Sequence, residues 1–162
     1  MSDLTIRAAR LSDAPAIIEL INQIIEQGGS TAYQTPWTDE FTLKKMQTDT
    51  DRSSWIVALK GDTLMGFQYF QPHPELPKDA PSIATFVRIG AVKMGIGSAL
   101  FHETLKAAHA IGYTWINATI LEHNTGGHSY YASRGFQIWN IDTKASLEDG
   151  TQVTKISRRY DL

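Results

Sequence analysis

Two glycines in the segment "VKMGIGSALF", residues 92–101, are the first candidates for chemistry. Gly95 and Gly97 stand directly before an apolar pattern that is typical of a helix. The first N–H groups of a helix have no intrahelical partner and carry partial positive charge, so a phosphate can bind there without a cationic side chain. The amides of residues 93–98 are therefore a candidate pyrophosphate cradle. A tight strand-to-helix turn would explain the same glycines equally well.

Neither of the two common glycine-rich nucleotide motifs fits this segment. The dinucleotide-binding pattern G-x-G-x-x-G needs a third glycine where this chain has Leu100. A P-loop ends in G-K-[ST], but Gly97 rather than a lysine precedes Ser98. The segment therefore indicates a phosphate site of another kind, or a turn alone.

The residues around the glycines predict a mixed sheet with helices on it, an α/β (α+β mixed) class. Apolar periodicity, helix caps and turn residues divide the chain in the order β-α-α-β-β-β-α-β-α-β-β. Gly61 and Asp62 predict a tight hairpin, and four prolines in 72–81 predict an exposed excursion. The expected strands are 4–9, 54–60, 63–71, 82–89, 114–121 and two around "FQIWNI" and "VTKISRRY"; the expected helices run from a cap at Ser12 or Asp13 to Gly28, over 39–46 with Thr38 as cap, from the glycine segment to Gly112, and over 125–134.

Taken with its flanks, the glycine segment resembles the GNAT N-acetyltransferase superfamily, and within it the phosphinothricin-acetyltransferase-like branch. The similarity begins in "TIRAARLSDAPAIIELIN" and continues through the hairpin "WIVALKGDTLMGFQYF". Its most specific part is "NTGGHSYYASRGF", which matches the family pattern N-x-x-S-x-x-x-Y-x-x-x-G-F at Asn124, Tyr131, Gly135 and Phe136. Because the similarity covers nearly the whole chain, a single N-acetyltransferase-like domain over residues 1–162 is expected.

The resemblance implies acetyl-CoA as co-substrate and a set of residues that hold it. It implies a GNAT-like, mostly antiparallel, twisted mixed sheet that splays between its fourth and fifth strands, where the pantetheine arm pairs with residues 85–87. Tyr131 would protonate the leaving thiolate while the amine attacks the acetyl carbonyl directly in a ternary complex. No metal and no covalent enzyme intermediate are implied. The expected acetyl-CoA contacts are Thr85, Phe86, Val87, Val92, Lys93, Met94, Gly95, Ile96, Gly97, Ser98, Asn124, Gly127, Tyr130, Tyr131 and Arg134.

The chain departs from the family pattern at positions that bear on catalysis. Val92 stands where the family has Gln or Arg, so backbone amides and Lys93 would have to hold the pyrophosphate. Ser82 stands at about the place of a glutamate that the related branch favours as general base. The general base is therefore open, with Glu122 as the catalytic candidate, acting through a water, and His123 as its alternative.

Three aromatic residues fall in regions that shape the acceptor pocket of this family, namely Tyr33, Trp37 and Tyr69, although ordinary packing also explains Trp37. The prediction is an acetyl-CoA-dependent N-acetyltransferase for the primary amine of a small molecule, an amino acid or an amino-acid-like xenobiotic. Val92 and the missing glutamate motivate an alternative, a degenerate CoA-binding or regulatory module without turnover. A third candidate is a protein or peptide N-acetyltransferase, which would need an open groove rather than a closed pocket.

Composition limits the remaining classes of function. The 162 residues carry 15 basic and 17 acidic side chains, a net charge of −2, so no global field favours nucleic acid or an anionic membrane. The chain has no cysteine, which excludes disulfides and thiolate metal sites and is consistent with a cytoplasmic location. The five histidines show no metal-ligand spacing, and the polar N-terminal stretch predicts neither a signal peptide nor a membrane span. The expected partner is a small amine, and the resemblance adds a possible homodimer.

Overall fold

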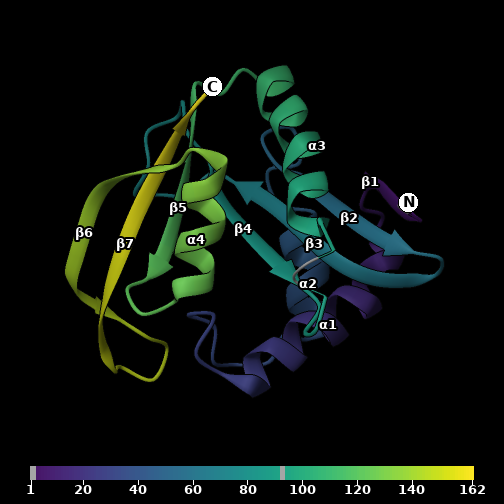
Figure 1. The fold of residues 1–162 in the computed structure, drawn as a ribbon, viewed down its shortest axis with the longest axis horizontal. Helices are drawn as coiled ribbons and strands as arrows, with labels where there is room; N and C mark the ends of the chain where they lie inside the picture. Colours follow the sequence, from purple (N-terminus) through teal and green to yellow (C-terminus); the bar gives the residue numbers. More distant parts are fainter. Residues whose placement is uncertain (1–2, 92–93) are drawn as a thin grey trace.

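One sheet of seven strands organises the structure, a computed structural model that describes residues 3–91 and 94–162 (Figure 1). The strand order is β1-β2-β3-β4-β5-β7-β6, and each neighbouring pair is antiparallel except β4 and β5. The predicted class and the predicted order of strands and helices are confirmed. The strands are β1 Leu4–Ala8, β2 Ser54–Lys60, β3 Thr63–Gln71, β4 Ser82–Val87, β5 Trp115–Leu121, β6 Gln137–Ser146 and β7 Gln152–Asp161; the helices are the 3-10 turn η1 Leu11–Asp13 and α1 Ala14–Gln27, α2 Asp39–Met46, α3 Ile96–Ile111 and α4 Thr125–Arg134.

Helices α1 and α2 cover one face of the sheet, and α3 covers the other (Figure 1). Helix α1 buries a stripe at helical spacing, which packs with Trp55, Phe67 and Tyr69 of the β2–β3 hairpin. On the opposite face, Ile96 and Leu100 of α3 pack against β2. Successive side chains of a strand point to opposite faces, so the hairpin contributes to both interiors.

The close approach of α3 depends on Gly66 in β3. A Cβ atom at this position would lie 2.9 Å from Ile96 Cγ2 and 3.0 Å from the Phe86 carbonyl oxygen. Real Cβ atoms essentially never come within 3.0 Å of another heavy atom, and the Phe86 oxygen lies at that limit, so a larger residue would force Ile96 and α3 to shift. Gly66 therefore fixes the position of the helix that begins at the glycine segment.

Strands β4 and β5 diverge from each other in the middle of the sheet. Within the described ranges, their parallel pairing holds at one register position, Ser82 opposite Asn117. Beyond Ser82, the edge of β4 that faces β5 has no strand partner there. The splay implied by the family resemblance is therefore present, and α4 lies beside it (Figure 1).

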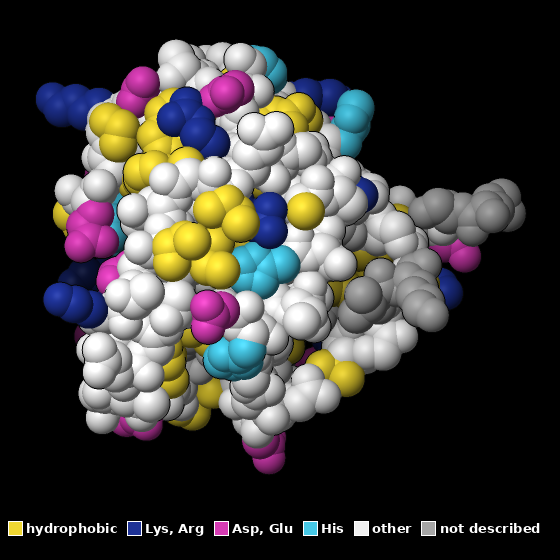
Figure 2. All heavy atoms as spheres, turned by 60° about the vertical axis from the view of Figure 1, so that its left-hand side comes forward, with side chains coloured by type: hydrophobic (Ala, Val, Ile, Leu, Met, Phe, Trp, Pro, Cys, Tyr) yellow, Lys and Arg dark blue, Asp and Glu magenta, His cyan; other side chains and the backbone are white. Residues whose placement is uncertain are grey.

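The last two strands form a long ribbon at the edge of the sheet. Strand β6 leaves three large hydrophobic side chains 44 to 56% exposed, those of Ile138, Trp139 and Ile141. Figure 2 brings this side of the molecule forward and shows hydrophobic side chains grouped on it. Trp139 is anchored, since its indole N–H donates to Asn117 Oδ1 at 2.8 Å.

Most of the predicted bounds agree with the structure, and the differences have local causes. The strand predicted over 82–89 ends at Val87, because the next residue turns back to β3: the Arg88 N–H donates to the Met65 carbonyl at 2.8 Å and Arg88 Nε to the Leu64 carbonyl at 2.7 Å. Asp13 takes the N-cap position of α1, but its carboxylate accepts from Arg7 and from the Arg10 N–H, so its side chain does not cap.

Candidate active site

Tyr131 reaches from α4 to the edge of β4. Helix α4 begins after Asn124, whose side-chain Oδ1 accepts the Gly127 N–H at 3.0 Å, an N-cap. In the following turns, the buried Tyr131 places its hydroxyl 2.8 Å from Thr85 Oγ1 of β4. The structure thus brings the predicted acid together with the strand edge predicted to hold the pantetheine arm.

Burial raises the pKa of the Tyr131 hydroxyl well above its usual value, and the hydrogen bond with Thr85 lowers it only in part. Removing a phenolate from water is costly, so the neutral phenol is favoured in this position. Tyr131 therefore holds its proton at neutral pH and can act as a donor.

A buried glutamine of β3 belongs to the same cluster. Gln68 Nε2 lies 2.9 Å from Thr85 Oγ1 and 3.0 Å from the Tyr130 hydroxyl, which in turn donates to the Gly97 carbonyl at 2.7 Å. The sequence analysis did not single out Gln68. The available signal was a glutamine inside the otherwise apolar run "LMGFQYF", because a polar residue in a strand buried on both faces must find partners.

Glycine is required at the two positions of the helix start for different structural reasons. Gly95 is the N-cap of α3 with φ of 76°, in the left-handed region that favours glycine. A Cβ atom at Gly97 would lie 2.5 Å from Tyr130 Cε1, so this glycine lets the helix approach the ring. The N-cap residue has no side chain to accept from the first-turn amides, and the N–H groups of Ile96, Gly97 and Ser98 have no hydrogen-bond acceptor within residues 3–91 and 94–162, so they stand at a positive helix end.

Arg134 brings a positive charge to this same helix end. Arg134 Nη1 donates to Ser98 Oγ, and its guanidinium carbon lies 5.3 Å from the centre of the Tyr130 ring. Met94, also predicted to contact acetyl-CoA, is 44% exposed just before the helix. Two further predicted contacts, Val92 and Lys93, lie outside the described residues.

Of the predicted pantetheine strand, Thr85 alone joins the polar cluster. Phe86 packs into the core on the side of α1, with its ring centroid 5.1 Å from that of Phe67. Val87 packs against the apolar residues under α3. A ligand along this edge would therefore meet Phe86 and Val87 through their backbone.

The predicted acceptor residues form an aromatic cluster on the opposite face. The hydroxyls of Tyr33 and Tyr69 lie 3.3 Å apart, and Tyr69 stacks on Trp55 with centroids 4.1 Å apart. Burial raises the pKa of both tyrosines. Trp37 is 3% exposed at the centre of this core, so its packing role is evident.

A lysine that the sequence analysis missed lies beside these rings. Lys45 Nζ of α2 is 5.1 Å from the centre of the Tyr69 ring, and burial lowers its pKa. No carboxylate of the described residues forms a salt bridge with it. A partly buried ammonium ion of this kind favours an anionic group nearby.

Neither Glu122 nor His123 takes part in the hydrogen bonds of the Tyr131 cluster within the described residues. Both are exposed at the end of β5, where they line a hollow of about 440 Å³ with Thr143 and Thr154. Asn124 was predicted to contact the pantetheine arm. In the structure its Oδ1 accepts the Gly127 N–H in the helix cap, and its Nδ2 donates to the Ser30 carbonyl at 3.1 Å. A Cβ atom at Gly127 would lie 2.7 Å from Asn124 Nδ2 and 3.1 Å from Ile120 Cγ2, so a larger residue here would require the capping side chain of Asn124 to shift.

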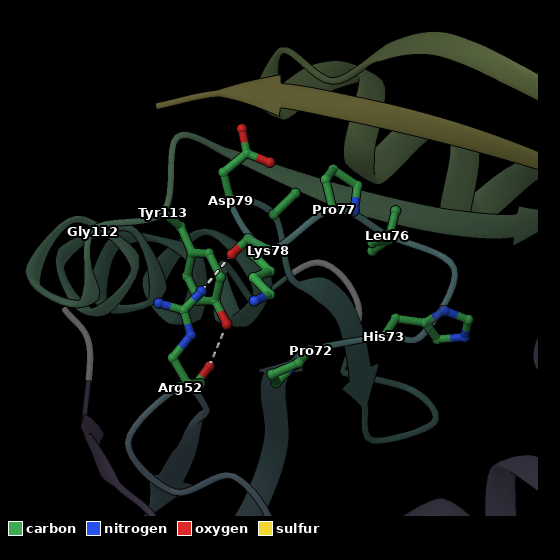
Figure 3. Close-up of a pocket in the computed structure, with 10 residues that line it drawn as sticks. Arg52, Pro72, His73, Leu76, Pro77, Lys78, Asp79, Gly112 and Tyr113 are labelled. Carbon is green, nitrogen blue, oxygen red and sulfur yellow. Dashed lines mark hydrogen bonds between the residues drawn. The ribbon is translucent and has the colours of Figure 1, made fainter.

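A separate hollow of about 430 Å³ lies where the proline-rich excursion meets the start of β5 (Figure 3). Its walls include Arg52 and Tyr113, whose hydroxyl donates to the Arg52 carbonyl at 2.8 Å while the guanidinium stacks 4.3 Å from the ring centre. None of the predicted site residues lines it.

Two kinds of feature are absent from residues 3–91 and 94–162. These residues contain no group of three or more His, Asp or Glu side chains that could hold a metal ion. None of their helices combines the length and the apolar character needed to cross a membrane.

A family model and a curated relative both match this chain as an acetyltransferase, and the relative covers nearly its whole length. A model of the acetyltransferase (GNAT) family matches residues 18–136. YwnH of Bacillus subtilis (strain 168), named as a phosphinothricin acetyltransferase, is 25% identical over 98% of this chain and 95% of its own.

The solved structures that share the fold include two acetyltransferases. The N-acetyltransferase of Staphylococcus aureus Mu50 superposes with a TM-score of 0.88 at 20% identity over 99% of both chains. A GNAT phosphinothricin acetyltransferase from Sinorhizobium meliloti, solved in complex with acetyl-CoA, gives a TM-score of 0.86 at 19% identity over 99% of this chain and 89% of its own. The predicted family and the predicted enzyme class, an acyltransferase, are confirmed: the chain belongs to the GNAT family of acetyltransferases.

Proposed function

We propose that this acetyltransferase uses acetyl-CoA to acetylate the primary amine of a small molecule. The observation that carries the proposal is the buried Tyr131 hydroxyl, held 2.8 Å from Thr85 at the edge of β4 that faces the splay. Family membership supports the reaction, and the acetyl-CoA complex of the Sinorhizobium meliloti relative supports the co-substrate.

The residues present fit the chemistry of acetyl-CoA. The backbone of residues 85–87 offers hydrogen-bonding groups along a strand edge, as an added strand or a pantetheine amide requires. The first-turn amides of α3, preceded by Met94 and Gly95, and the Arg134 guanidinium supply positive potential for a pyrophosphate. Asn124, Gly127 and Tyr130 would act mainly by holding α4 and α3 in place around the ligand.

Tyr131 would act as general acid in a direct transfer. The amine lone pair attacks the acetyl carbonyl carbon, so that the C–N bond forms, the C–S bond breaks, and the thiolate takes the Tyr131 proton. Burial raises the pKa of the Tyr131 phenol, which by itself makes the phenol a weaker acid, but desolvation also makes a buried thiolate more basic than it is in water, so the two effects offset each other. The attacking nitrogen loses its own proton to a base, for which we propose Glu122 through a water, and solvent returns a proton to Tyr131.

The acceptor is proposed to be an amino acid or an amino-acid-like compound. Tyr33, Tyr69 and Trp37 offer an aromatic surface with two hydroxyls. Lys45 beside Tyr69 forms no salt bridge with the described residues, so its ammonium ion can receive an acidic group of the substrate. The name of the Bacillus subtilis relative is consistent with such an acceptor, because phosphinothricin is an amino-acid analogue.

Two measurements test the proposal together. Calorimetric titration with acetyl-CoA is expected to show saturable binding, and a screen of amines with detection of the released thiol is expected to single out amino acids. No binding at millimolar acetyl-CoA would overturn the proposal in favour of a degenerate module, as would binding without thiol release from any amine. Thiol release with peptides but not with free amino acids would favour the protein-acetylating alternative.

We further propose that residues 1–162 form a single domain, located in the cytoplasm and assembled as a homodimer. The cysteine-free composition supports the location, and the exposed Ile138, Trp139 and Ile141 of the edge strand β6 support an interface between two copies. Light scattering after gel filtration should give twice the monomer mass of 18.0 kDa, and a monomer at all concentrations would refute the dimer.

A further inference from the structure

Five groups from four different elements form one chain of hydrogen bonds in the splay. They are the Gly97 carbonyl of α3, the Tyr130 hydroxyl of α4, the Gln68 carboxamide of β3, the Thr85 hydroxyl of β4 and the Tyr131 hydroxyl of α4. The four links measure 2.7, 3.0, 2.9 and 2.8 Å in this order, so each is a hydrogen bond of ordinary length.

The first two links have a fixed direction. A carbonyl oxygen can only accept a hydrogen bond, so the Tyr130 hydroxyl must donate its single proton to the Gly97 carbonyl. The Gln68 atom at 3.0 Å from that hydroxyl therefore has to be a donor, which identifies it as the amide nitrogen rather than the carboxamide oxygen. The orientation of the Gln68 side chain is thus set by a backbone group at the start of α3.

The same logic extends to Tyr131. The second N–H of the Gln68 amide points to Thr85 Oγ1, which accepts it. The Thr85 hydroxyl then has its own proton to donate, and its other partner among the described residues is the Tyr131 oxygen. If Thr85 donates to Tyr131, the phenolic proton is used by no protein group in these links and is free for a bound ligand.

We infer that Gln68 and Thr85 are positioning residues that fix the direction of this chain, so that Tyr131 accepts from the protein and presents its own proton to the thioester. The inference rests on the proposed role of Tyr131 as general acid. It also connects two parts of the site, because the helix start proposed to hold the pyrophosphate determines the direction of the proton at the reacting end.

The burial of Gln68 supports a role for its amide donors. Gln68 is fully buried, and its carboxamide oxygen has no hydrogen-bond partner among the described residues. An unpaired buried acceptor is destabilising, whereas an apolar side chain of similar size would fill the same space without that cost. The glutamine is therefore explained by its two N–H groups rather than by packing.

A double-mutant cycle tests the inference by turnover. Thr85→Val keeps the shape of the side chain but removes the hydroxyl, and it is expected to lower kcat about tenfold. Thr85→Ser restores a hydroxyl and should recover most of that loss. In a Tyr131→Phe background, Thr85→Val should change kcat by less than about twofold, since the group that it orients is gone. Equal losses in both backgrounds would show a merely structural role and overturn the inference.

A second measurement does not depend on catalysis, so it separates failure of the inference from failure of the proposed function. In a proton–nitrogen correlation spectrum, both carboxamide protons of Gln68 are expected to be protected from solvent exchange. Thr85→Val should shift one of them and Tyr130→Phe the other, while Gln68→Leu identifies the pair by removing it. If neither substitution moves these resonances, the chain does not exist as inferred, whether or not the protein acetylates an amine.

Discussion

The two faces of strand β3 carry opposite kinds of interior. Toward α1 and α2, Phe67 and Tyr69 stack with Trp55, with centroid distances of 6.2 Å for Phe67 and 4.1 Å for Tyr69. Toward α3 and α4, the residue between them, Gln68, is equally buried but bonds to two hydroxyls. The alternation of a strand thus separates an aromatic interior from a polar one by a single residue.

This difference separates what stabilises the fold from what orients the chemistry. On the aromatic face, the indole N–H groups of Trp37 and Trp55 are buried without a partner in the described structure, and ring burial offsets their cost. On the polar face, the amide protons of Gln68 and the hydroxyl proton of Tyr130 each have a defined acceptor. Removing side-chain volume from the aromatic face should therefore lower the stability of the fold, whereas removing an orienting hydrogen bond from the polar face should lower turnover.

The largest expected effect is on the aromatic face. Phe67 is fully buried between the rings of Trp55, Tyr69 and Phe86, so Phe67→Ala is expected to lower the free energy of unfolding by about 3–5 kcal/mol. Urea unfolding followed by fluorescence measures it. Phe41→Ala is the matched control, because that ring is 44% exposed and should cost less than about 1 kcal/mol. Equal losses would mean that the aromatic face is not the main source of stability.

On the polar face, a substitution should affect turnover far more than stability. Tyr131→Phe keeps the ring and removes the proton, so we expect kcat for acetyl transfer to fall about 100-fold with acetyl-CoA affinity nearly unchanged. Tyr113→Phe is the control, since it deletes a hydrogen bond of the same length, 2.8 Å, in the hollow of Figure 3. Steady-state rates and thermal unfolding should show similar stability losses but slow turnover for Tyr131→Phe alone. Unchanged turnover would remove Tyr131 from the mechanism.

A methyl group tests how tightly the polar face is packed. At Gly97 it would meet the Tyr130 ring, so Gly97→Ala should cost about 1–3 kcal/mol and weaken acetyl-CoA binding as the helix start moves. At Gly126 in α4 the nearest atom is 3.8 Å away, and Gly126→Ala should be neutral or slightly stabilising. Chemical denaturation and calorimetry compare the two variants. A neutral Gly97→Ala would show that the contact with Tyr130 is soft.

Local signals were sufficient to predict most of the fold. The Gly61-Asp62 turn, the Thr38 cap and the glycines that end α3 and α4 act within a few residues of themselves, and they gave the element bounds closely. The end of β4 was predicted too late, because its cause is the bonding of Arg88 to β3, more than 20 residues earlier in the chain. A propensity pattern contains no information about that contact.

The candidate site was harder to predict for the same reason. The spacing around Asn124 and Tyr131 predicted which residues matter, but the Tyr131–Thr85 bond joins residues 46 positions apart and the Gln68–Tyr130 bond residues 62 apart. Gly97 illustrates the limit. A phosphate cradle and a close helix approach need the same residue, so only the distance to Tyr130 reveals its packing role.

The smallest effect that we predict concerns a charge pair at the edge of the aromatic face. Arg7 of β1 donates to the Asp13 carboxylate at 2.8 and 2.9 Å, and this hydrogen bonding holds the pKa of Asp13 below its usual value. A lowered pKa in the folded state contributes stability above the ordinary Asp pKa of about 4, and that contribution disappears as the pH falls through the lowered value.

Asp13→Asn should therefore be less stable than the parent by about 1 kcal/mol at pH 7, with the difference vanishing near pH 2. Urea unfolding of both proteins across this range measures it, and Asp161→Asn serves as control, because its pair with Arg159 is exposed and should contribute nothing measurable. A difference that persists unchanged at low pH would assign the effect of Asp13 to the turn between β1 and α1, where its carboxylate also accepts the Arg10 N–H, rather than to its charge.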